Sequence, residues 1–151
     1  MLAVLLSLPA PAVAQGDNIY ITNLKGVQDK IVQLAQAMPE ATYGWRPEEG
    51  VRSVSEVYMH MASGNYGYGR RIGVESPADR NQWEKTVTGK AEVIAKLKAS
   101  YDAIITALEK ADFSKPEVLA TAMNAISHGH EHLGQSIAYA RMNKVVPPWS
   151  R

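Results

Sequence analysis

Residues 127–136 read SHGHEHLGQS and hold three of the chain's four histidines. On an α-helix, side chains four residues apart lie on the same face, so His128 and His132 can direct both imidazoles to one point. A transition metal bound by neutral imidazoles takes about three or four ligands, which leaves a place for a distant partner. The one histidine outside this stretch is His60. The spacing therefore predicts a metal site in which His60 joins this pair.

These histidines belong to a predicted helix that runs from about residue 116 to residue 142. Pro116 suits the first turn of a helix, and Glu117 beside it is favourable near a helix N-terminus. The helix must end before Pro147 and Pro148, because proline cannot continue it.

Three more helices are predicted upstream, because apolar residues recur there at intervals of three and four. They cover residues 18–38, a segment that begins at Ser53, and residues 89–110. The second of them starts with a capping box, in which Ser53 and Glu56 each bond the other's backbone amide. Four amphipathic helices and no convincing segment of period two predict an all-α protein, an antiparallel four-helix bundle.

Two long connections, residues 40–52 and 75–88, carry one tryptophan each. Their glycines and prolines predict irregular backbone, and we expect Trp45 and Trp83 to pack onto the bundle as apolar anchors. Four glycines between residues 64 and 73 weaken the end of the second helix, each by up to about 1 kcal/mol relative to alanine. We therefore expect that end to be close-packed or distorted.

The composition limits the classes of function. With 151 residues, 46% of them apolar and 21% charged, the chain fits one compact domain with a hydrophobic core. Its formal net charge is +1 and its basic residues are scattered, so we expect no nucleic-acid partner. Cysteine is absent, so a bound metal must be held by nitrogen and oxygen atoms.

Residues 1–14 read MLAVLLSLPAPAVA and end in a small-residue pattern directly before Gln15. The pattern predicts a secretory signal, truncated at its basic end and cleaved near Ala14. The run is shorter than the roughly 20 apolar residues that span a bilayer, so we expect no stable membrane span. We predict an exported protein, periplasmic or extracellular, in which residues 15–151 form a single domain. The alternative is a cytoplasmic protein with an apolar N-terminal tail.

The helix at residues 116–142 has apolar or amphipathic residues on two sides. At about 100° per residue, one side carries His130 beside a stripe of large apolar residues, which are Leu119, Ile126, Leu133 and Ile137. The metal-site pair lies nearly opposite, beside Thr121, Ala125, Ser136 and Tyr139. Periodicity alone thus favours His130 as the inward histidine. Since such a helix is usually buried on both sides, we expect a homodimer that covers one of them.

Residues 128–132 also spell H-x-x-E-H, the pattern of inverted zinc peptidases in which Glu131 would be the general base. Those enzymes take a further carboxylate ligand from well downstream. Because no Asp or Glu lies between Leu133 and Arg151, peptidase chemistry is disfavoured. Glu131 is expected to be a solvated or interface residue.

Three motifs together are typical of one family. They are RSVSEVYMHMASGN around His60, HGHEHLGQSIAYARMNKVVPP at residues 128–148, and a W-x-P loop at Trp45 and Pro47. With these motifs the sequence resembles the DinB-like superfamily of metal-binding four-helix bundles, which includes the bacillithiol and mycothiol transferases. The resemblance covers residues 18–150, nearly the whole expected domain.

In that family one histidine comes from the second helix and two, four residues apart, from the last helix before a Gly-Gln pair. The resemblance therefore implies that His60, His128 and His132 are the metal ligands. It also implies that His130 lies outside the metal site, in its surroundings or at an interface. The family's last motif commonly has an arginine where this chain has Leu133, and an adjacent histidine pair where it has Glu131 and His132. These departures preserve the three ligands but change their neighbourhood.

Family members with known activity use a divalent metal, typically zinc or nickel, to lower the pKa of a small-molecule thiol. The resemblance implies the same arrangement here, with water in the open coordination position until a thiol or another substrate arrives. Our first hypothesis is a metal-dependent thiol S-transferase or hydrolase acting on a small molecule. A second is a non-catalytic exported metal-binding or stress-related bundle, since the sequence offers no general base. A third is a purely structural dimer.

Overall fold

The computed structural model describes residues 18–150, so the predicted signal at residues 1–14 lies outside the described part. Within it there are helices and turns but no strand. The helices are α1 (Ile19–Ala37), α2 (Val54–Gly69), α3 (Trp83–Thr86), α4 (Lys90–Glu109) and α5 (Pro116–Met142). The four long helices confirm the ranges that the sequence predicts.

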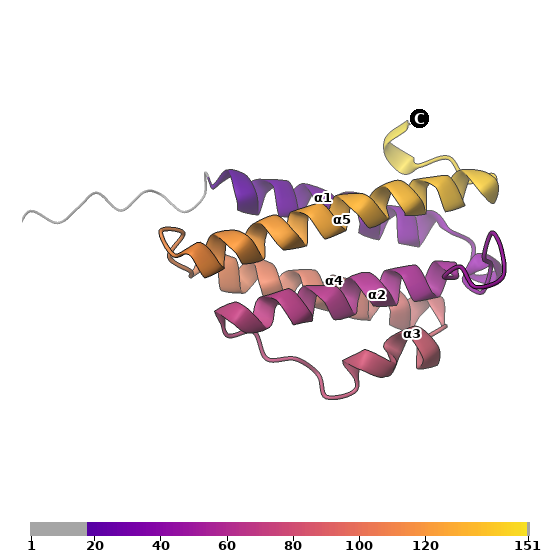
Figure 1. Ribbon diagram of the computed structural model, residues 1–151. Coiled ribbons are helices and arrows are strands. Elements are labelled where there is room, and N and C mark those ends of the chain that lie inside the picture. Colours follow the sequence, from indigo (N-terminus) through magenta and orange to yellow (C-terminus); the bar gives the residue numbers. More distant parts are fainter. Residues whose placement is uncertain (1–17, 151) are drawn as a thin grey trace, which may run out of the picture.

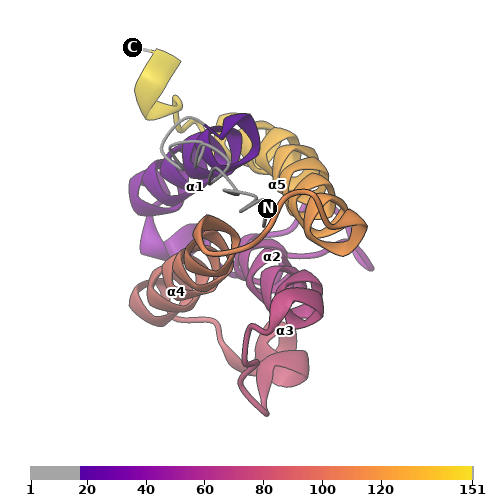
Figure 2. The same cartoon turned by 90° about the vertical axis from the view of Figure 1, so that its left-hand side faces the viewer.

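The four long helices pack along their lengths (Figure 1), and the end view shows α3 beside α2 on the outside (Figure 2). Around the bundle, α1 contacts α5, α5 contacts α2, α2 contacts α4, and α4 contacts α1. The chain runs one way in α1 and α5 and the other way in α2 and α4. The all-helical bundle is confirmed, with two antiparallel and two parallel neighbouring pairs in place of a uniformly antiparallel arrangement. The reason is the long connection after α2, which returns along the bundle.

The start of α2 is fixed by the predicted capping box. Glu56 N donates to Ser53 Oγ at 3.3 Å, and Ser53 N donates to Glu56 Oε2 at 2.7 Å. The glycine-rich half of α2 remains helical up to Gly69 and then tightens into a 3-10 turn, Arg70–Ile72. Gly73 ends that turn with φ of 87°, a left-handed conformation that favours glycine. The predicted distortion is therefore confined to the very end of the helix.

Both tryptophans in the connections pack against the bundle, as predicted. Trp83 is only 2% exposed, and the ammonium of Lys96 lies 4.4 Å from the centre of its ring. Trp45 meets Tyr139 of α5 edge to face, with ring centroids 5.4 Å apart. Among residues 18–150, no helix has the length and apolarity to cross a membrane.

A glycine in α5 permits close approach of two other helices. A Cβ on Gly129 would lie 2.8 Å from Val27 Cγ1 of α1 and 3.1 Å from Tyr101 Oη of α4. We expect Gly129→Ala to lower the free energy of unfolding by about 1–3 kcal/mol, since overpacking forces neighbours to shift. Urea titration measures this. Gly134→Ala is the matched control, because nothing lies within 4 Å of that Cβ position; equal destabilisation of both variants would contradict the packing argument.

Candidate metal centre

Three histidines meet where α2 and α5 run antiparallel. Each offers one ring nitrogen, and these nitrogens all lie within 4.8 Å of one another. The ring centroids of His60 and His132 are 4.9 Å apart, and those of His128 and His132 are 4.6 Å apart. The structure thus brings together all three residues that the sequence nominates.

The two helices approach closely here because α2 has a glycine opposite a ligand. A Cβ on Gly64 would lie 2.6 Å from His128 Cε1, closer than real Cβ contacts come. His132 is buried at 7% exposure, while His60 and His128 are half-buried. The cluster therefore lies at the edge of the core, where it is shielded from solvent on one side.

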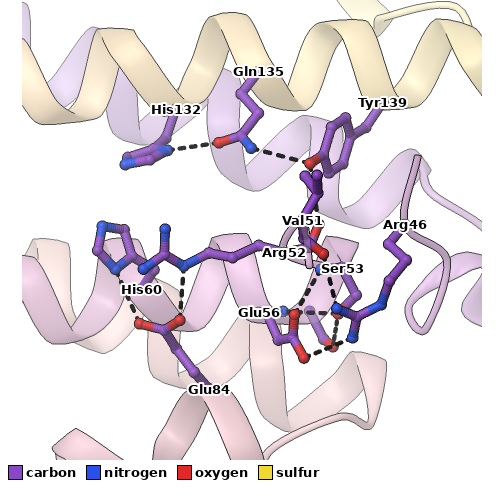
Figure 3. Close-up of polar contacts among 11 residues, drawn as sticks. Arg46, Val51, Arg52, Ser53, Glu56, His60, Glu84, His132, Gln135 and Tyr139 are labelled. Carbon is purple, nitrogen blue, oxygen red and sulfur yellow. Dashed lines mark hydrogen bonds and ion pairs between the residues drawn. The ribbon is translucent and has the colours of Figure 1, made fainter. Parts of the chain in front are cut away.

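A chain of hydrogen bonds fixes the tautomer of His132 (Figure 3). Tyr139 Oη donates to the backbone carbonyl oxygen of Arg52 at 3.0 Å, because a carbonyl can only accept. The same hydroxyl accepts from Gln135 Nε2 at 3.0 Å, so Gln135 turns its Oε1 to His132 Nδ1 at 2.8 Å. Nδ1 must then carry the proton. Nε2 of His132 is left with a free lone pair.

A carboxylate fixes the tautomer of His60 (Figure 3). Glu84 Oε1 lies 3.0 Å from His60 Nδ1, and Arg52 Nε donates to the other oxygen of Glu84 at 2.7 Å. Partial burial alone would raise the pKa of Glu84, but the hydrogen bonds from Arg52 and His60 lower it below its ordinary value. An ionised Glu84 accepts a hydrogen bond from the Nδ1–H group of His60, which leaves Nε2 as the ring nitrogen available to a metal. Histidines that bind metals are commonly oriented by a carboxylate in this way.

His128 completes the donor set. Its Nδ1 is buried and has no hydrogen-bond partner among residues 18–150, and Tyr68 packs edge-on against its ring with centroids 5.5 Å apart. Burial, followed by the charges of His132, His60 and Arg52, lowers the pKa of His128 to about 4. Burial also lowers the pKa of His132. Both imidazoles are therefore neutral near pH 7, as metal ligands must be.

Three imidazoles within this distance suit a divalent transition metal. Calcium and magnesium prefer oxygen ligands, whereas imidazole suits zinc, nickel, copper and iron. The unpartnered nitrogen of His128 and the fixed tautomers of its two neighbours fit such an ion. A closed structural zinc site has four protein ligands; three leave a position open.

Comparison with known proteins adds the family. The sequence profile of the DinB superfamily matches residues 23–138, a span that includes all three histidines. This chain belongs to the DinB superfamily. No curated protein and no solved structure gives a significant match.

In this DinB-superfamily chain the buried face of α5 is not the face that hydrophobic periodicity predicts. Of the stripe of large apolar residues, Leu133 alone is buried, and Leu119 is 37% exposed. The buried side carries small residues instead, among them Thr121 and Ala125. His130 is exposed and bonds Asn23 of α1 at 2.9 Å, outside the cluster. Choosing His130 from periodicity is therefore wrong, because the buried side of α5 carries mainly small residues and not the stripe of large apolar ones.

Glu131 is exposed, as expected of a solvated or interface residue. The sequence of this DinB-superfamily chain does not predict two residues near the cluster: Glu84, which is hydrogen-bonded to His60, and Arg52, which is hydrogen-bonded to Glu84. Arg52 lies in the connection before α2 and Glu84 in the short helix α3, where no apolar periodicity indicates them. The one signal in the sequence that points to Glu84 is its neighbour Trp83, because a buried tryptophan fixes the position of the residue beside it.

The low pKa of His128 predicts how the metal-free DinB-superfamily protein responds to acid. The folded-state pKa of about 4 lies below the ordinary value near 6.5, so protonation favours the unfolded chain. We expect the free energy of unfolding, measured by urea titration with EDTA present, to fall as pH falls from about 6.5 toward 4. The variant His128→Gln should show a flatter dependence. An identical dependence in both proteins would contradict this assignment.

Proposed function

We propose that the protein binds a divalent transition metal ion, zinc or nickel, through His60, His128 and His132 and acts on a small molecule as a transferase or hydrolase. One observation carries the proposal. Three imidazole nitrogens converge within 4.8 Å, and hydrogen bonds to Glu84 and Gln135 orient two of the rings. A surface histidine pair has no need of such support.

When bound, a zinc or nickel ion lowers the pKa of a coordinated water or thiol and so supplies a nucleophile near neutral pH. The chain's own residues have separate roles. Glu84 and Gln135 keep His60 and His132 in the tautomers that present Nε2. The bundle shields the back of the cluster, where His132 is buried.

The test is turnover of a panel of thiol-acceptor and ester substrates by protein that is metal-free, zinc-loaded or nickel-loaded. We expect activity with a loaded metal and none in the metal-free protein. His60→Ala should lose both the metal and the activity, whereas His130→Ala should keep both. Activity that survives in the metal-free protein would overturn the proposal.

A second candidate is a non-catalytic exported metal-binding bundle. It is favoured by the engagement of Glu84, whose two oxygens are taken by His60 and Arg52. No other carboxylate in the described part of the chain is hydrogen-bonded to the three histidines, so no free general base contacts them. Stoichiometric metal without turnover of any substrate in the panel would support this candidate over the first.

A further inference from the structure

Both the backbone and the side chain of Arg52 are held in place beside the histidine cluster. Its backbone oxygen accepts from Tyr139 of α5, and its Nε donates to Glu84, which also holds His60. Its guanidinium extends toward His60 in Figure 3. The position of this cation relative to the cluster is therefore fixed by two helices, α5 through Tyr139 and α3 through Glu84.

The outer edge of the Arg52 guanidinium is free. Nε is occupied by Glu84, but neither Nη atom has a hydrogen-bond partner among residues 18–150, and the side chain is 43% exposed. Arg46 in the same connection differs, because its Nη1 bonds Val51 O and its Nη2 bonds Glu56. Two free Nη groups form the fork that pairs with a planar carboxylate through two parallel hydrogen bonds.

The local charge also favours an anion. Arg52 and Glu84 form one ion pair beside the cluster, with Nε 2.7 Å from Oε2. Glu131, next to His132 on α5, is exposed to solvent, which screens its charge. A divalent ion at the three histidines would add two positive charges, and Glu84, the one carboxylate hydrogen-bonded to them among residues 18–150, is already paired with Arg52. A negatively charged ligand would restore that balance.

We propose that Arg52 recognises a carboxylate on the small molecule that occupies the remaining coordination position. This inference rests on the proposed metal centre and specifies its ligand class. Arg52 is thus a specificity-determining residue: its Nη groups bind the carboxylate, and its Nε bond to Glu84 keeps the guanidinium beside His60. Neutral small molecules of the same shape bind more weakly.

The test uses cobalt(II)-loaded protein, since a thiolate that binds cobalt gives a charge-transfer absorption band. Two probes are titrated separately: mercaptoacetate and its neutral isostere mercaptoacetamide. In each case the thiol proton is released to solvent as sulfur binds cobalt. The measured quantity is the ratio of the two dissociation constants, in which any general effect of a mutation on the metal cancels.

We expect wild-type protein to prefer mercaptoacetate, and Arg52→Gln to reduce that preference by about tenfold. Arg52→Lys should retain part of it, because lysine keeps the charge but lacks the fork. Arg141→Gln removes an equal charge from an exposed position on α5 and should leave the ratio unchanged.

Two outcomes would overturn the inference in different ways. An equal ratio in wild type and Arg52→Gln, with cobalt bound to both, rejects the role of Arg52 and leaves the metal centre standing. Failure of wild-type protein to bind cobalt rejects the metal centre and, with it, the ligand assigned to it.

Discussion

Adding zinc to the metal-free protein is expected to raise its midpoint of thermal unfolding by roughly 5–10 °C at a free zinc concentration near 100 times Kd. At that concentration a ligand that binds only the folded state contributes about 2.7 kcal/mol. The unfolded chain separates His60 from His128 and His132, so it cannot offer the same three nitrogens. His128→Ala should abolish most of this shift, because two ligands remain.

The matched control for this prediction is His130→Ala. His130 lies two residues from His128 on the same helix, but it is exposed and bonds Asn23. Its removal should leave the zinc-induced shift intact. A shift that persists in His128→Ala, or disappears in His130→Ala, would show that zinc binds elsewhere on the surface. Differential scanning fluorimetry gives both results from the same samples.

Gly64→Ala is expected to weaken metal binding at least about tenfold without removing any ligand. The new Cβ would lie 2.6 Å from His128 Cε1, so the imidazole must move. In metal-free protein that movement costs little, because the ring is the end of a flexible side chain, and alanine gains up to about 1 kcal/mol of helix propensity. A bound metal, however, requires the His128 imidazole to stay in its original position. In Gly64→Ala the zinc affinity should therefore fall, while the free energy of unfolding of the metal-free protein rises.

Gly67→Ala separates this effect from a general change in α2. Its nearest neighbour would be Arg80 Nη1 at 3.7 Å, an ordinary contact. Competition with a chromophoric chelator measures zinc affinity, and urea titration with EDTA measures the stability of the metal-free protein. Equal zinc affinities in Gly64→Ala, Gly67→Ala and wild type would show that the close approach does not govern the position of His128.

The helices and their starts could be predicted because their signals are local. The apolar periodicity of α1 and α4 lies within each segment, and the capping box at Ser53 involves residues three apart. The histidine pair on α5 could be predicted for the same reason, since spacing of four fixes a common face. The relative directions of the helices could not be predicted from local signals, because they depend on the path of the connection after α2.

The surroundings of the histidines were predicted less well, for two physical reasons. Periodicity counts large apolar side chains, whereas α5 turns its small residues inward and leaves Leu119 37% exposed. Glu84 bonds His60, and Arg52 bonds Glu84 although the two lie 32 residues apart in sequence, so only the folded chain brings them together. The homodimer and the exported location stay predictions.

The central claim is that His60, His128 and His132 together hold one metal ion. Its most direct test is the metal content, by inductively coupled plasma mass spectrometry, of protein purified without a histidine tag. We expect about one zinc or nickel ion per wild-type chain and almost none when any of the three is replaced by alanine. Wild-type protein without stoichiometric metal, or variants that retain it, would contradict the claim.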